Sequence, residues 1–280
     1  MEWLAAALTI QAPPQFVTFS ARTGCYDSPV PFTISHAAAV IPLRGFARFP
    51  LPLAALMIGS LSPDFAYFLP GELGRVETHS FAGLFWFCWP VSIGLWLLFV
   101  RVLELPTIAL LPENWRTRFA PSNQEINLHV LAFASAAVIL GAVTHVVWDS
   151  FTHRGTVAVN AIPALKAVAF RVEGWRIRWF FVLQVLSSVF GLLVLAFWAW
   201  RQAPGQYPRP STPSVTHATR MRALAVLIAA SLGLAITSYY FHSHMWLTAR
   251  VFHFLIGGMT GLALAWCAIA VLIRRSWKAA

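Results

Sequence analysis

Six long apolar stretches decide what this chain of 280 residues can fold into. Each has roughly the 17 to 25 predominantly apolar residues that a helix needs to cross a lipid bilayer. We therefore predict an all-α fold, a polytopic membrane protein with about six transmembrane helices. The predicted spans are Leu51–Leu69, Phe81–Leu103, Leu128–Trp148, Trp179–Trp200, Ala223–Tyr240 and Val251–Ile273.

Composition indicates that the bilayer is the main solvent of this chain. Hydrophobic residues make up 58% of it and charged residues 11%, whereas soluble domains average about 45–50% and 25%. So few charges cannot solvate a water-facing surface, which excludes an ordinary soluble globule and a disordered chain. The net charge of +10 is spread between the apolar stretches. That spread indicates membrane topology and contact with anionic lipid, and argues against nucleic-acid binding.

Shorter segments divide the chain further. The apolar stretch Ile34–Leu43 is too short to span alone, so we expect a short N-terminal hairpin helix, partly inserted beside the first span. The first residues do not resemble a signal peptide, because Glu2 stands where a positive charge belongs and Pro13 interrupts a short apolar run. Four prolines and four arginines in residues 201–222 predict a linker outside the membrane. The expected organisation is a dispensable extension 1–29, a membrane domain 30–200 carrying the site, the linker 201–222, and a two-helix segment 223–280.

Ionisable residues inside these spans are the candidates for function. An aspartate at the centre of a membrane helix costs roughly 2.5 to 3.5 kcal/mol on insertion scales. Two of the three aspartates lie near helix ends, and alternation of the spans brings one set of polar residues to the same membrane face. His36 joins this set if its short helix folds back along the first span. The candidate metal ligands are His36, Asp64, His79, His145, Asp149 and His153.

The spacing of three of these residues suits metal binding. His145, Asp149 and His153 follow at i, i+4 and i+8, which places them on one helical face. The first two are about 6 Å apart along the axis and can close on one ion through bonds of roughly 2 Å. His153 lies a further turn away, so it needs a second ion, a helix break near Gly155, or a different role. Imidazole with carboxylate suits a divalent ion, with zinc first and manganese or iron as alternatives.

Other polar residues on the same face have supporting roles in this interpretation. Asp64 or Glu77 is the candidate catalytic base, and Arg75 and Arg154, with Arg176 and Arg178, are candidates to hold an anionic group. In the fourth span, Gln184 and Ser188 lie on a face of small and polar residues. Tight helix packing is one explanation of this face, and support for a site histidine is the other.

Ordinary explanations compete with each of these roles. A membrane histidine such as His36 or His79 can simply hydrogen-bond a neighbouring helix. Asp64 can cap a helix or pair with Arg75, and the His145 set can be an interfacial His–Asp hydrogen bond. His242 and His244 share the site's side and are outside candidates, whereas His129 and His217 carry no role.

Several motifs resemble a known family. They are Pro31–His36, Ile58–Ser60 with Ser62–Phe65, Thr78–Ser80, Gly141–His145 through Asp149 to His153, and Leu183–Gln184 with Ser187–Ser188. Over residues 30–200 they look like the bacterial integral membrane family called domain of unknown function DUF4184. The order of the polar residues is distantly similar to that of inner-membrane metal-dependent hydrolases described as LexA-binding. The motif from His145 to His153 also resembles the zinc-dependent phospholipase C and nuclease P1 group, which implies phosphoester hydrolysis.

Three functions follow from these patterns. The first is a metal-dependent hydrolase in a bacterial inner membrane that acts on a phosphoester or lipid head group, with its site on the extracytoplasmic face and membrane lipids as partners. The second is a transporter or proton relay, which requires a polar path through the membrane. The third is a membrane scaffold whose histidines only link helices.

Overall fold

A computed structural model describes residues 33–43, 51–69, 75–119, 121–122, 125–172, 175–202 and 215–279. Within these ranges the protein is almost wholly helical, with one two-stranded sheet, which confirms the predicted all-α class. The expected extension 1–29 and residues 203–214 of the expected linker lie outside the described residues.

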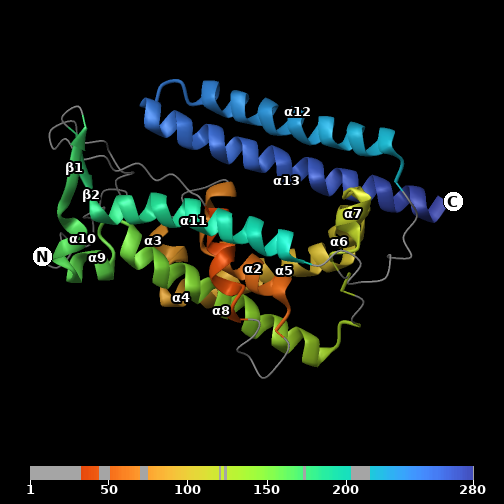
Figure 1. The fold of residues 1–280 in the computed structure, drawn as a ribbon, viewed down its shortest axis with the longest axis horizontal. Helices are drawn as coiled ribbons and strands as arrows, with labels where there is room; N and C mark the ends of the chain where they lie inside the picture. The colour runs from red at the N-terminus through yellow and green to blue at the C-terminus, as the bar shows by residue number, and fades with distance from the viewer. Residues whose placement is uncertain are drawn as a thin grey trace, which may run out of the picture.

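Figure 1 shows the order of the elements along the chain. The first group is η1 (Thr33–Val40), α2 (Leu53–Leu61), η2 (Ser62–Phe68), α3 (Arg75–Thr78), α4 (Phe81–Gly83), η3 (Leu84–Cys88), α5 (Trp89–Leu98), η4 (Phe99–Leu103), α6 (Glu104–Leu110) and α7 (Glu113–Arg116). The second group is α8 (Leu128–Thr152), α9 (Val157–Ala161), α10 (Pro163–Lys166), β1 (Val168–Val172), β2 (Trp175–Arg178), α11 (Trp179–Arg201), α12 (His217–Phe241) and α13 (Leu247–Ala279).

Five helical stretches are long and apolar enough to cross a membrane. The first expected span, Leu51–Leu69, is found as a shorter apolar helix, Leu53–Phe68. This helix changes from α-helix in α2 to 3₁₀-helix in η2. Pro63 explains the change, because it has no N–H to continue the α-helical bonds, and the Ser62 hydroxyl donates to the Gly59 carbonyl instead. The five full spans are Phe81–Leu110, Leu128–Ala161, Trp179–Arg201, His217–Phe241 and Ala249–Lys278.

Helices α2 and α8 cross in direct backbone contact. A Cβ on Gly59 would lie 2.2 Å from the Val138 carbonyl oxygen, and one on Gly141 would lie 2.3 Å from the Leu56 carbonyl oxygen. Only glycine fits at both positions, so the two helices can approach this closely. Leu56 and Val138 are fully buried beside the crossing. The crossing fixes the start of η2 against the second half of α8.

Two further contacts complete the molecule. Helix α11 packs on η1 where Gly191 faces the backbone of Ser35. Helices α12 and α13 run side by side along one edge, with α13 between α12 and the other helices (Figure 1). Helix α12 begins at His217, inside the segment expected to be linker. The hydropathy pattern does not predict the hairpin of β1 and β2, because both strands lie outside the apolar spans.

Candidate metal centre

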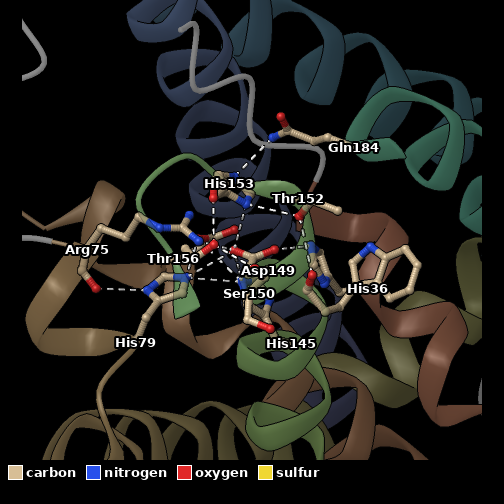
Figure 2. A network of polar contacts seen from close by, with 12 residues as sticks. His36, Arg75, His79, His145, Asp149, Ser150, Thr152, His153, Thr156 and Gln184 are labelled. Carbon is tan, nitrogen blue, oxygen red and sulfur yellow. Dashed lines mark hydrogen bonds and ion pairs between the residues drawn. The ribbon is translucent and has the colours of Figure 1, made fainter. Parts of the chain in front are cut away.

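Three segments bring four acidic and imidazole side chains together. Helix α8 supplies His145 and Asp149, η2 supplies Asp64, and the turn after α3 supplies His79. One ligand atom from each residue lies within 4.8 Å of those of the other three. None of the four side chains is more than 9% exposed. Figure 2 shows His79 and His145 turned toward Asp149.

The distances between the ligand atoms are short and similar. The Nε2 atoms of His79 and His145 are 3.3 Å apart. Asp149 Oδ2 lies 3.4 Å and 3.3 Å from these two nitrogens, and Asp64 Oδ1 lies 3.5 Å and 3.7 Å from them. Four ligands around a zinc ion at about 2.0–2.1 Å would be roughly 3.3 Å from one another, as tetrahedral geometry requires. The cluster therefore has the dimensions of a metal site.

Backbone carbonyls fix the orientation of both imidazoles. The Nδ1 of His145 lies 2.8 Å from the Ser60 carbonyl oxygen, and the Nδ1 of His79 lies 3.0 Å from that of Arg75. A carbonyl only accepts, so each Nδ1 carries the proton and donates it. Nε2 of each ring then points into the cluster and carries a lone pair in the neutral form of the ring, as in metal sites that hold histidine through the other nitrogen.

Charge also favours a cation in this position. Asp64 Oδ1 and Asp149 Oδ1 are buried and have no hydrogen-bond partner. Two carboxylates face the two imidazoles, and Arg75 pairs with one of them, Asp149. Buried carboxylates require compensation by positive charge or hydrogen bonds. The buried His/Asp cluster can therefore hold a metal ion.

His36 and His153 lie at the edge of this cluster. The ring of His36 stacks on His145 with centroids 3.9 Å apart, and its Nε2 is 3.5 Å from Asp149 Oδ1. His153 is close because α8 ends at Thr152, which turns the next residue back so that its Nδ1 lies 3.5 Å from Asp149 Oδ2. A helix break thus brings His153 back to Asp149, one of the alternatives left open by its spacing.

Gln184 on α11 reaches the outer side of His153. Its Nε2 lies 3.0 Å from the Nε2 of His153 (Figure 2). The amide donates, so His153 Nε2 accepts and its proton resides on Nδ1, toward Asp149. The Ser188 hydroxyl donates to the Gln184 carbonyl oxygen at 2.8 Å. In this arrangement His153 orients the carboxylate of Asp149.

Comparison with family models gives one match. Residues 30–273 match the model of the domain of unknown function DUF4184. The chain belongs to this family. The match includes α12 and nearly all of α13, which the motifs of the first 200 residues did not cover. Comparisons with curated proteins and with solved structures gave no match, so the likeness to metal-dependent hydrolases stays a hypothesis.

The remaining predicted residues of this DUF4184 protein lie around the cluster. Arg75 donates from Nη2 to Asp149 Oδ2 at 2.5 Å, so it pairs with Asp149 rather than with Asp64. Burial opposes its charge, but Asp149, Tyr67 and Asp64 together outweigh burial and raise the pKa of Arg75 above its usual value. Glu77 is exposed on α3, and Arg154 is exposed in the turn after α8.

Two contacts in the DUF4184 site were not predicted. The Thr33 hydroxyl donates to Asp64 Oδ2 at 2.7 Å. The Ser60 carbonyl orients His145. A threonine three residues before His36 is a weak signal for the first contact. No side-chain pattern signals the second, because the acceptor belongs to the backbone.

Proposed function

We propose that this DUF4184 protein is a membrane-embedded, metal-dependent hydrolase that acts on a phosphoester or lipid head group. His79, His145, Asp64 and Asp149 hold one divalent ion, zinc in the first place and manganese or iron as alternatives. His36 is a further ligand on the Asp149 side. The site faces the extracytoplasmic side of a bacterial inner membrane.

One observation carries the proposal. Two imidazoles whose Nδ1 atoms are already engaged by backbone carbonyls direct their Nε2 atoms at each other across 3.3 Å, beside two buried carboxylates. Two carboxylates this close repel each other unless a cation lies between them, and a metal ion bound by both Nε2 atoms would supply that charge. A helix-linking role for these histidines does not require this convergence.

A bound divalent ion would lower the pKa of water toward about 7 and polarise a phosphoryl oxygen. The protein's own residues orient and balance this site. Glu77, exposed on α3 two residues before His79, and Asp64, within the cluster, are the candidate bases. Arg75 neutralises Asp149 from one side, and with Arg154 it is positioned to attract an anionic head group. The cluster lies where α8, a spanning helix, approaches its end, which favours a substrate at head-group level.

Elemental analysis of the detergent-purified full chain tests the metal site. We expect about one zinc, manganese or iron ion per chain in the wild type, and loss of it in H145A/D149A. The matched control is H242A/H244A, which removes two histidines that lie near each other in the turn before α13. The control should keep its metal.

The competing explanation is that protonated imidazoles compensate the two carboxylates. It predicts a metal-free wild type whose thermal unfolding does not change on addition of zinc or a chelator. That result would reject the metal site. Hydrolysis is tested separately, by release of water-soluble phosphate compounds from phospholipids in nanodiscs, where metal-loaded protein without any activity rejects the reaction but leaves the site.

A further inference from the structure

The hairpin of β1 and β2 stands at one end of the molecule, beside α9 and α10 (Figure 1). Its last residue, Arg178, leads directly into the spanning helix α11, which begins at Trp179. The base of the hairpin is tied down, because the Trp179 N–H donates to the Ala167 carbonyl at 3.1 Å and Arg178 Nη1 donates to that of Lys166 at 2.7 Å. Trp179 is itself exposed, as expected of a tryptophan at a membrane interface. These contacts fix the hairpin at the level where α11 enters the bilayer.

The two faces of the hairpin differ in chemistry. The antiparallel register pairs Phe170 with Ile177 and Arg171 with Arg176. Side chains alternate between faces along a strand, so Phe170, Val172 and Ile177 share one face and the two arginines share the other. Phe170 and Val172 are each 51% exposed. The hairpin therefore presents an uncovered apolar face and a basic face.

The two arginines on the basic face oppose each other directly. Directly paired residues have Cβ atoms about 4.5–5.5 Å apart, and like charges there destabilise a hairpin. Both arginines are exposed, and neither forms an ion pair with a carboxylate among the described residues. Two guanidinium groups at this separation can donate together to the oxygens of one phosphate group. A phosphate would turn the repulsion into a stabilising contact.

An isolated two-stranded hairpin is at best marginally stable in water, so an uncovered apolar face needs an apolar partner. We infer that the β1–β2 hairpin lies in the membrane interface, with Phe170 and Val172 toward the acyl chains and with Arg171 and Arg176 holding the phosphate of an anionic phospholipid. The other apolar partner would be the hairpin of a second copy of the chain. Such a dimer would bring four guanidinium groups together between two chains that each carry a net charge of +10, and this repulsion disfavours it. This inference goes beyond the proposed hydrolase, since the hairpin would bind lipid whether or not a metal occupies the site.

Native mass spectrometry of the full chain, titrated with phosphatidylglycerol or phosphatidylcholine, tests this inference. We expect wild type to prefer phosphatidylglycerol by about 30-fold, from two arginines near the surface. R171Q/R176Q should reduce that preference to within about twofold, because it removes both charges. R171K/R176K keeps the charges but not the planar donors, so it should retain an intermediate preference.

The matched control, R275Q/K278Q, removes two exposed charges from the end of α13, at the opposite ends of the spans, and should leave the preference unchanged. Excess inorganic phosphate should not displace the lipid, because it lacks acyl chains for the apolar face. Equal binding of both lipids by wild type, or an unchanged preference in R171Q/R176Q, would overturn the inference. So would a wild-type dimer that R171Q/R176Q dissociates without changing lipid preference. Metal content, measured on the same samples, reports separately on the metal site.

Discussion

The crossing of α2 and α8 and the pairing of α12 and α13 are built in the same way, yet only one of them forms a candidate site. Both depend on glycines that face a neighbouring backbone, Gly141 against Leu56 in the first and Gly261 against Ala230 in the second. At the first crossing, the close approach of the two backbones places the Ser60 carbonyl beside His145. At the second, Ser231 donates to the Gly258 carbonyl, and no titratable group is buried there among the described residues.

This difference teaches that close helix packing fixes the positions of backbone atoms. Whether such a position becomes a candidate site depends on the ionisable residues that lie beside it. At the α2–α8 crossing, a backbone carbonyl becomes a hydrogen-bond acceptor that orients an imidazole. Along α12, the exposed apolar side chains, such as Leu224, Ile228 and Leu232, are suited to lipid contact. Substitutions of the same kind in the two regions should therefore have different consequences for metal binding.

The largest effect is expected from alanine at the crossing glycines. In G141A the new Cβ would lie 2.3 Å from the Leu56 carbonyl oxygen, so the helices must separate. Overpacking of this kind costs about 1–3 kcal/mol, and separation moves the Ser60 carbonyl away from His145. We expect a lower thermal midpoint in detergent and less than half of the wild-type metal content.

G261A provides the comparison, since its Cβ would also lie 2.3 Å from a carbonyl oxygen, that of Ala230. It should lower the thermal midpoint and keep the metal content. G94A is the neutral control, because nothing lies within 4 Å of its new Cβ. Equal metal loss in G141A and G261A would show that metal content follows stability alone.

An effect confined to the metal cluster, without a change in helix packing, is expected from neutralising a buried acid. D64N removes the charge of an oxygen that faces two imidazoles, so metal affinity, measured by competition with a chelator, should fall by about 100-fold or more. Glu104, at the start of α6, is the matched buried acid outside the cluster. E104Q should bind metal as wild type does. An unchanged affinity in D64N would remove Asp64 from the ligand set.

The smallest effect is expected from the outer contact on α11. Q184A removes the donor to His153 Nε2 and frees this ring to rotate away from Asp149. Loss of such an outer contact typically costs 10–100-fold in metal affinity, and we expect about tenfold because His153 keeps its other neighbours. Q202A, which removes a donor to the Trp198 carbonyl near the end of the same helix, should leave affinity unchanged. Equal affinities of the two variants would assign Gln184 to helix packing.

Much of the fold could be predicted because lipid imposes a simple rule of length and apolarity. Five spans have that length and are found as helices. The first expected span is shorter and partly 3₁₀, a consequence of Pro63 that hydropathy does not register. The start of α12 at His217 and the β1–β2 hairpin also differ from expectation, since polar and basic residues outside the membrane follow no such rule.

The candidate site was predicted in composition but not in geometry. Alternation of the spans placed Asp64, His79 and Asp149 at one membrane face, and the structure brings them together with His145. The contact between Thr33 and Asp64 and the pairing of Arg75 with Asp149 join segments far apart in the chain. Such contacts depend on helix rotation and depth, which residue spacing within one segment does not specify.

The sequence by itself determined that this chain has helices suited to a membrane, where most of them lie, and which few ionisable residues are costly enough there to be candidates for a function. Only the tertiary structure decided that both imidazoles donate Nδ1 to backbone carbonyls and direct Nε2 toward the carboxylates. The reason is physical: transfer into lipid depends on the side chains of one segment at a time, whereas the orientation of a ring depends on atoms contributed by other segments.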